Sequence, residues 1–167
     1  MKISLIGPMA AGKSTVGHDL AQKLALPLYD TDTEIEKKMH ATVSQIFAER
    51  GEATFRQLES DVLLELLSKQ EDCIIATGGG IIKAASNRTF LKTQTLVFFL
   101  DVSISEQLKR TEGDHTRPIL NGVNREDKLT HLRSERWTLY QETAHHILIV
   151  DQLNPEALAL QIQNKML

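Results

Sequence analysis

The stretch GPMAAGKST, residues 7–15, decides the fold, because it matches Gly-x-x-x-x-Gly-Lys-Ser and lies between an apolar run at 3–6 and a stretch of helical periodicity at 14–26. This strand, loop and helix context is what makes the match a phosphate-binding loop. Its glycines allow a tight turn whose N–H groups point inward, and the start of the helix adds a partial positive charge. We expect Lys13 to reach the β- and γ-phosphates of a nucleotide and Ser14 to ligate Mg²⁺. The alternative is a glycine-rich turn without a ligand.

Short apolar runs alternate with stretches of helical period along the rest of the chain, an arrangement typical of a parallel α/β sheet covered by helices on both faces. No linker, repeat or low-complexity tract separates them, so we expect a single domain over residues 1–167. The predicted strands are 3–6, 28–29, 73–76, 96–100 and 147–150, and the predicted helices are 14–26, 33–49, 54–69, 103–111, 125–143 and 155–166.

The composition fits one globular domain and excludes some partners. With 41% apolar and 25% charged side chains, the 167 residues suffice for one core. A net charge of −3 removes any bulk electrostatic attraction for nucleic acid or an anionic membrane, so neither is an expected partner. The apolar run before Gly7 is too short for a signal peptide or a membrane span. The single Cys73, expected to be buried and inert, fits a reducing compartment, so we expect a cytoplasmic protein.

A phosphate-binding loop indicates a nucleotide but does not say what becomes of it. The Asn-Lys-x-Asp and Asp-x-x-Gly strings of GTP-binding switches do not occur in the chain, which argues against a GTPase. Residues 112–124, EGDHTRPILNGVN, hold a proline and two glycines and have no periodicity, so we expect a lid there. A phosphate-binding loop with a lid in a small protein favours a kinase that moves the γ-phosphate of a nucleotide to a small acceptor.

Two aspartates, Asp30 and Asp32, follow the predicted strand at 28–29. Because ligands in open α/β folds bind at the carboxyl ends of the strands, both should lie beside the phosphate-binding loop. We expect them to serve Mg²⁺ and the hydroxyls of an acceptor. The alternative is helix capping, because Thr31-x-x-Glu34 matches a capping box and either aspartate could serve the N-terminus of the next helix. Capping explains one aspartate but not obviously both.

Three further features are candidates for the site. The segment ATGGGI, residues 76–81, follows another predicted strand, and its three glycines expose backbone to a close neighbour. Arg56 lies three residues before Glu59, either as half of an exposed helical pair or as a clamp for a carboxylate. Arg110 and Arg117 bracket the start of the expected lid, so closure would bring Arg117 onto the transferred phosphate; the alternative is a solvated basic segment.

Taken together, these motifs resemble those of one family. GPMAAGKST, DTD, FRQLE, TGGG, RPIL and Arg136-x-x-x-Tyr140 stand in an order and spacing similar to shikimate kinase, across essentially the whole chain. The resemblance implies a three-layer P-loop kinase fold with strand order 2-3-1-4-5, a shikimate-binding region near 31–60 and a lid near 112–124. It also implies transfer of the γ-phosphate of ATP to the 3-hydroxyl of shikimate, a step in aromatic amino-acid biosynthesis, and it suggests a monomer.

The resemblance also implies roles for individual residues. Asp32 would hold the shikimate hydroxyls and orient the one that attacks, and Asp30 would reach Mg²⁺ through water. Arg56, Arg136 and the backbone at Gly79 would bind the shikimate carboxylate and ring. The expected catalytic residues are Lys13, Asp32 and Arg117, and the residues expected to bind ATP are Ala10, Ala11, Gly12, Lys13, Ser14, Thr15, Arg110 and Arg117.

One departure and two rival functions accompany the resemblance. Ala10 stands where the family often has Gly, which puts the backbone angles of the loop in question, since Ala tolerates positive φ poorly. Residues 151–155, in the region that contacts adenine, are variable in such kinases and are not assigned. A gluconate-kinase-like enzyme would keep the loop without a double-arginine site, and a silent nucleotide-binding module would transfer nothing.

Overall fold

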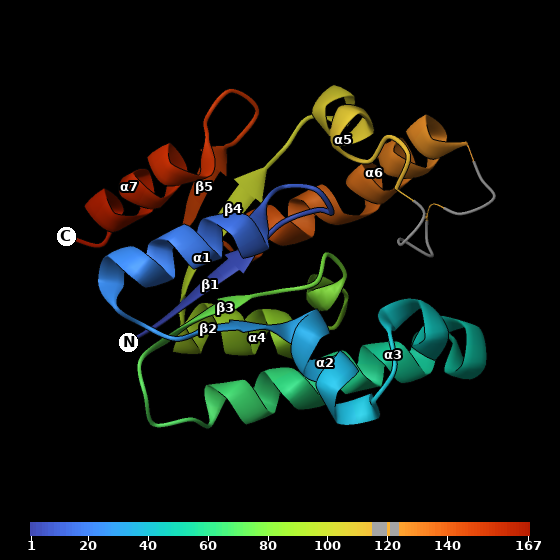
Figure 1. Cartoon of the computed structure of the whole chain (residues 1–167), viewed down its shortest axis with the longest axis horizontal. Helices are drawn as coiled ribbons and strands as arrows, with labels where there is room; N and C mark the ends of the chain where they lie inside the picture. Colours follow the sequence, from blue (N-terminus) through green and yellow to red (C-terminus); the bar gives the residue numbers. More distant parts are fainter. Residues whose placement is uncertain (115–119, 121–123) are drawn as a thin grey trace.

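Five strands form one parallel sheet in the described part of the chain, which comprises residues 1–114, 120 and 124–167 of the computed structural model (Figure 1). The strand order is β2-β3-β1-β4-β5, which confirms the predicted α/β fold and strand order. Most of the predicted lid, 112–124, lies outside the described residues. The strands are β1 (Lys2–Ile6), β2 (Leu28–Asp30), β3 (Cys73–Ala76), β4 (Leu96–Asp101) and β5 (His146–Ile149), and the helices are α1 (Lys13–Leu24), α2 (Thr31–Met39), α3 (Val43–Leu67), the 3₁₀ helix η1 (Ile81–Lys83), α4 (Ala85–Gln94), α5 (Ile104–Arg110), α6 (Arg125–Thr143) and α7 (Pro155–Lys165).

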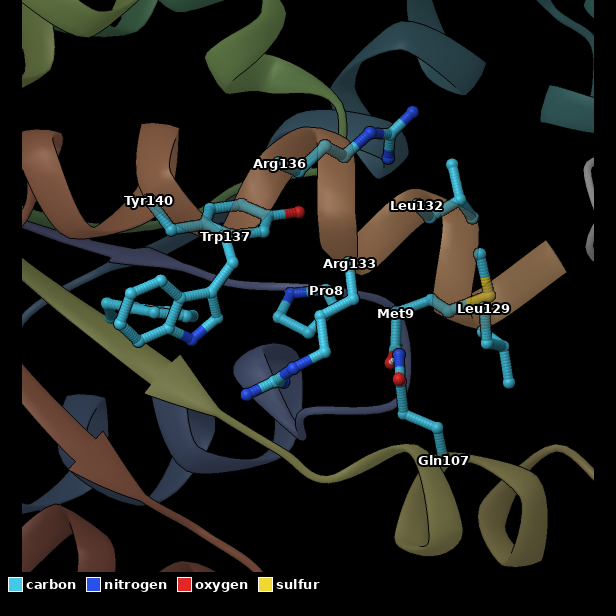
Figure 2. Close-up of a pocket in the computed structure, with 10 residues that line it drawn as sticks. Pro8, Met9, Gln107, Leu129, Leu132, Arg133, Arg136, Trp137 and Tyr140 are labelled. Carbon is cyan, nitrogen blue, oxygen red and sulfur yellow. Dashed lines mark hydrogen bonds between the residues drawn. The ribbon is translucent and has the colours of Figure 1, made fainter. Parts of the chain in front are cut away.

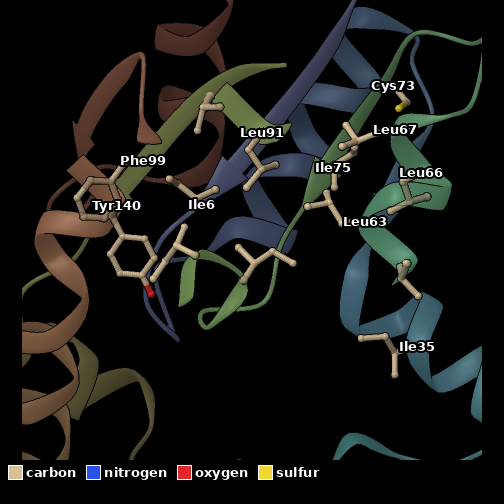
Figure 3. Packing of buried hydrophobic residues seen from close by; sticks show 14 of the residues in the cluster. Ile6, Ile35, Leu63, Leu66, Leu67, Cys73, Ile75, Leu91, Phe99 and Tyr140 are labelled. Carbon is tan, nitrogen blue, oxygen red and sulfur yellow. The ribbon is translucent and has the colours of Figure 1, made fainter. Parts of the chain in front are cut away.

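Alternate residues along the strands face two separate cores. Ile3 and Leu5 of β1 and Phe98 of β4 belong to the core that α1 and α7 cover. Ile6 of β1 and Phe99 of β4 belong to the opposite core, which Figure 3 shows between the sheet and the helices α2, α3, α4 and α6. Strands that are apolar on both faces are typical of a parallel sheet covered on both sides, as the sequence predicts. The two covered faces leave the carboxyl ends of the strands as the place for a site.

The predicted helix at 33–49 is wrong, because the chain forms two helices there. His40 ends α2 in the left-handed region at φ 51°, and Thr42 begins α3 with a capping box that pairs its side chain with Gln45. The predicted break between 49 and 54 is present only as an interruption of α3 at Gly51, whose φ of 80° is not helical. Local capping chemistry therefore outweighs an apolar period that runs through both segments.

Helix α4 is absent from the predicted set. Its sequence, ASNRTFLKTQ, is mostly polar, and only Asn87 and Leu91 are buried, so it carries a weak periodic signal. No side chain caps its first turn. The helix is stabilised by its packing, since Leu91 joins the core formed by β1, β3 and β4. This is a case in which tertiary contacts decide a helix that propensity does not.

Cys73 lies in β3 and is fully buried. Burial raises the pKa of its thiol, as expected for an inert cysteine. Among the helices of the described residues, none combines the length and the apolar character that crossing a bilayer requires.

Candidate active site

The phosphate-binding loop, the aspartates after β2 and the glycines after β3 line a single cleft at the carboxyl ends of the strands, with a volume of about 560 Å³. The structure therefore brings together the segments that the sequence singled out separately. The residues lining the cleft are Met9, Ala10, Ala11, Gly12, Lys13, Ser14, Thr15, Val16, Asp30, Asp32, Thr77, Gly78, Gly79, Arg110, Leu153, Pro155 and Leu158.

The loop itself has the backbone that an anion-binding turn needs. Gly12, directly before α1, has φ 88°, and Ala10 has φ 64°. Ala10 is thus in the left-handed region, which costs a non-glycine residue about 1–2 kcal/mol. The departure at Ala10 therefore places local strain in the loop. Lys13, Ser14 and Thr15, at the start of α1, line the cleft, and the first N–H groups of a helix have no partner within the helix.

Side chains from two helices hold the loop in place. The Lys13 ammonium donates to the carbonyls of Gly7 at 2.7 Å and Pro8 at 2.8 Å. From α5, the Arg110 guanidinium donates to the carbonyl of Ala10 at 2.9 Å and to Glu106 at 3.0 Å. The predicted nucleotide residues Lys13 and Arg110 consequently lie at the loop. Arg117, the predicted lid arginine, lies outside the described residues.

Asp30 is the N-cap of α2, so the capping alternative is confirmed for one of the two aspartates, although the N-cap is not Thr31. One Asp30 oxygen accepts from the backbone N–H groups of Asp32 at 2.9 Å and Thr33 at 3.2 Å. The hydroxyl of Thr31 instead accepts from the N–H of Gly78 at 2.9 Å, which ties the end of β2 to the end of β3. Capping thus accounts for one aspartate and leaves Asp32 for another role.

Ser14 and Asp30 have side chains suited to binding Mg²⁺. The Ser14 hydroxyl donates to the second carboxylate oxygen of Asp30, so the two side chains touch at the mouth of the phosphate-binding loop. Mg²⁺ takes oxygen ligands and is usually held by one or two carboxylates together with substrate phosphates and water. A hydroxyl and a carboxylate in contact, beside an anion-binding loop, match that chemistry.

Asp32 faces a second buried carboxylate, that of Glu59 on α3. Asp32 Oδ1 and Glu59 Oε2 are buried without a hydrogen-bond partner within the described residues, and each lies 2.8 Å from where a Cβ on Gly78 would stand. Burial, then the charges of Glu59 and Asp30, raise the pKa of Asp32 to about 6, while Lys13 lowers it. Burial also raises the pKa of Glu59. Two unpaired carboxylate oxygens in one buried place indicate a position for hydroxyl donors.

Replacement of Gly78 by alanine is expected to disrupt this acidic pair. The new methyl group would lie at 2.8 Å from both carboxylate oxygens, so at least one side chain must move. Overpacking of this kind costs about 1–3 kcal/mol. Thermal unfolding should show a melting temperature lower by roughly 2–12 °C. An unchanged melting temperature would contradict the close approach at Gly78.

Arg56 lies beside the same pair, on the helix that carries Glu59. Its Nη1 donates to Glu59 Oε1 at 2.8 Å, and Glu59 is 1% exposed, so the exposed-pair alternative is wrong. The guanidinium carbon of Arg56 lies 5.9 Å from the ring centre of Phe47 and 5.4 Å from that of Phe55, close enough for cation–π contacts. A Cβ on Gly80 would lie 2.2 Å from Nη1, so glycine is needed where the arginine crosses the loop. The consecutive glycines therefore make room for the acidic pair and for the arginine.

Arg136 reaches the same region from α6. It is 6% exposed, and its Nε has no partner within the described residues. Its charge lowers the pKa of Glu59, which places it near the acidic pair. Figure 2 shows the side chain extending from α6 away from the Trp137 indole, beside a small cavity that Tyr140 also lines. The Tyr140 hydroxyl donates to the carbonyl of Gly79, so α6 is fastened to the glycine loop one turn after Arg136.

The chain is similar to known proteins of one family. A family model described as Shikimate kinase matches residues 9–167. The chain belongs to the shikimate kinase family. Among its relatives, the shikimate kinase of Acinetobacter baylyi is 43% identical over 160 residues, covering 96% of this chain and 88% of the relative. The shikimate kinase of Methylococcus capsulatus is 41% identical over 162 residues, covering 97% of this chain and 90% of the relative.

Solved structures of the shikimate kinase family have the same fold. The shikimate kinase from Acinetobacter baumannii, solved in complex with shikimate, superposes with a TM-score of 0.95 at 43% identity and covers 99% of this chain and 92% of that chain. The shikimate kinase from Aquifex aeolicus superposes with a TM-score of 0.86 at 34% identity, covering 99% of this chain and 96% of that chain. A deoxyadenosine kinase from M. mycoides, at 19% identity and a TM-score of 0.63, shares the fold alone. The resemblance drawn from the sequence is confirmed.

Some residues of this shikimate kinase family site were not assigned from the sequence. Gln107 of α5 donates to the carbonyl of Met9 at 3.0 Å, a contact between positions 98 residues apart that no local pattern indicates. Leu153 and Pro155 line the cleft from the segment left unassigned at 151–155. Leu153 lies just before α7 and Pro155 is its first residue, so their place in the chain order of the elements was the signal that could have found them.

Proposed function

We infer that this chain transfers the γ-phosphate of ATP to the 3-hydroxyl of shikimate, giving shikimate 3-phosphate and ADP in aromatic amino-acid biosynthesis. The observation that carries the inference is the junction of two kinds of site. An anion-binding loop with Lys13 adjoins a buried acidic pair and two arginines, near enough that Lys13 lowers the pKa of Asp32. A substrate that is both a polyol and a carboxylate suits that combination.

On the nucleotide side, we assign the backbone N–H groups of the loop to the phosphates and Lys13 to the β- and γ-phosphates. Arg110, which holds Ala10, would lie near the adenine. Leu153 and Pro155 supply apolar lining on the same side of the cleft. The assigned ATP-binding residues are Ala10, Ala11, Gly12, Lys13, Ser14, Thr15 and Arg110, with Arg117 added on the family resemblance alone.

On the acceptor side, Arg56 and Arg136 would bind the carboxylate of shikimate and Asp32 its hydroxyls. Support comes from the unpaired Nε of Arg136 and the unpaired Oδ1 of Asp32, since buried polar atoms without partners are rare in native proteins. The backbone at Gly79, with its carbonyl fixed by Tyr140, would border the ring. The shikimate-binding region is accordingly proposed at about 31–60 with Arg136 added, and the lid at about 112–124.

Ser14, and Asp30 through water, would hold Mg²⁺. An ion held there would neutralise negative charge on the phosphates. Its place rests on the contact between the Ser14 hydroxyl and the Asp30 carboxylate. We further propose a cytoplasmic monomer, in keeping with the slightly acidic composition and the family resemblance.

The chemical step needs position and charge neutralisation more than a strong base, because phosphoryl transfer passes through a loose transition state. Lys13 would stabilise the negative charge on the transferred group. Asp32 would orient the attacking hydroxyl and accept its proton. With a pKa near 6, Asp32 is ionised at neutral pH and is a better proton acceptor than an ordinary aspartate.

An acceptor panel tests the assignment. ADP release from ATP and Mg²⁺ should rise with shikimate and saturate, and gluconate or buffer alone should give only background hydrolysis. Faster release with gluconate would favour the rival sugar-acid kinase. Nucleotide binding without any acceptor-dependent release would favour a silent nucleotide-binding module.

A further inference from the structure

Arg56 must hold one orientation to clamp a carboxylate. A free arginine side chain has roughly 2 kcal/mol of rotamer entropy, so the groups that restrain it decide how well it is preorganised. Glu59 binds Nη1 at 2.8 Å and fixes one side of the guanidinium. The opposite side, formed by Nε and Nη2, needs a second restraint.

Glu52 supplies that restraint from the same helix. Its Oε1 accepts from Arg56 Nη2 at 3.3 Å and from Arg56 Nε at 3.4 Å. The two carboxylates, four residues before Arg56 and three residues after it, therefore bind different sides of one guanidinium. The edge between Nη1 and Nη2 still has hydrogens for a substrate carboxylate, because each of these nitrogens carries two.

Glu52 is itself held from outside the helix. The Lys83 ammonium, at the end of η1, donates to the same Glu52 oxygen at 3.0 Å. Glu52 directly follows Gly51, where α3 is interrupted at φ 80° and ψ 171° and starts again. Lys83 thus links the restarted half of α3 to the glycine loop after β3, across which Arg56 passes at Gly80.

We propose that Glu52, held by Lys83, is a positioning residue that fixes the Arg56 guanidinium for the carboxylate of the acceptor. This proposal rests on the proposed function, because Arg56 is taken to bind that carboxylate. The hydrogen bond from Lys83, with a smaller contribution from Arg56, lowers the pKa of Glu52 below its usual range, so Glu52 is charged at neutral pH. Neither Glu52 nor Lys83 touches the substrate in this account.

The competing explanation is an ordinary surface ion pair. Glu52 is 47% exposed and Lys83 is 44% exposed at their side chains, and exposed pairs contribute about 0–1 kcal/mol to stability. A pair of that kind would not change acceptor binding. The effect of removing the pair on KM for shikimate, compared with its effect on KM for ATP, separates the two explanations.

The test compares Glu52→Gln, Lys83→Met and the double variant with the wild type. We expect Glu52→Gln to raise KM for shikimate by about fivefold and Lys83→Met by about threefold, the range of one exposed charge-assisted hydrogen bond. The double variant should resemble Glu52→Gln, because Lys83 acts through Glu52. KM for ATP, kcat and the melting temperature should change little.

Lys38→Met is the matched control. Lys38 pairs with Glu65 across α2 and α3, with 42% and 60% exposure, and lies away from the glycine loop. It should leave KM for shikimate unchanged. An unchanged KM for shikimate in Glu52→Gln, or multiplicative effects in the double variant, would overturn the positioning role.

Calorimetric titration with shikimate, without ATP, gives a second readout. A wild-type chain that binds shikimate but does not phosphorylate it would contradict the proposed function, and the dissociation constant of Glu52→Gln would still decide the positioning role. Full wild-type turnover with no effect of Glu52→Gln on either readout would overturn the positioning role alone.

Discussion

Replacement of Asp32 by asparagine is expected to lower kcat with shikimate by about 10²- to 10⁴-fold, the range for loss of a general acid–base group. The amide keeps the size of the side chain but cannot accept the proton of the attacking hydroxyl. ATP binding should be retained, since the phosphate-binding loop is unaltered. Steady-state kinetics and nucleotide titration measure the two effects separately.

The same variant should be more stable than the wild type at pH 8. The folded-state pKa of Asp32 is about 6, above the ordinary aspartate value of 3.8, so the chain takes up a proton on folding between these pH values. The wild type therefore loses stability as pH rises from about 4 to 6, by about 3 kcal/mol. Asparagine avoids this loss, which should raise the melting temperature at pH 8 by roughly 6–12 °C and leave it nearly unchanged at pH 4.

Glu34→Gln is a suitable control, because Glu34 also lies in the first turn of α2 and forms an ion pair with Lys37 of the same helix. It should change neither kcat nor the pH dependence of stability by a comparable amount. If Asp32→Asn kept full activity, or if it were less stable than the wild type at pH 8, the assignment of a strained, functional carboxylate would be wrong.

Replacement of Lys13 by methionine is expected to lower kcat/KM by about 10³-fold, a typical loss when a group that stabilises transition-state charge is removed. Methionine keeps much of the length of lysine but removes the ammonium that would meet the β- and γ-phosphates. Shikimate binding measured by calorimetry without nucleotide should remain, because the arginines and Asp32 are intact.

Lys23→Met, in the last turn of the same helix, provides the control for loss of one positive charge from α1. It should retain activity. A Lys13→Met enzyme with near-normal turnover would contradict the role of the loop in phosphate binding. If the variant bound neither ATP nor shikimate, Lys13 would mainly maintain the loop through its hydrogen bonds to the carbonyls of Gly7 and Pro8.

The fold was predictable because its signals are local. Apolar runs matched the strands to within a residue or two, and helix α6 was predicted with the bounds Arg125–Thr143 that the structure has. Where the prediction failed, a local device or a tertiary contact decided the outcome. His40 ends a helix in the left-handed region, and α4 is held by the burial of Leu91.

The site was predictable in its residue types but not in its connections. The sequence indicated that Asp30 and Asp32 lie near the phosphate-binding loop, yet it could not show that Asp30 caps α2 and touches Ser14 while Asp32 faces Glu59. The reason for consecutive glycines also needs three dimensions. Gly78 and Gly80 yield space to side chains of α2 and α3 that are distant in the chain.

A crystal structure of the chain with shikimate and ADP tests the central claim most directly. We predict that the shikimate carboxylate lies within hydrogen-bond distance of Arg56 and Arg136, that a ring hydroxyl lies on Asp32, and that the 3-hydroxyl faces the phosphate-binding loop. Shikimate bound elsewhere, or bound with its carboxylate away from both arginines, would contradict the account.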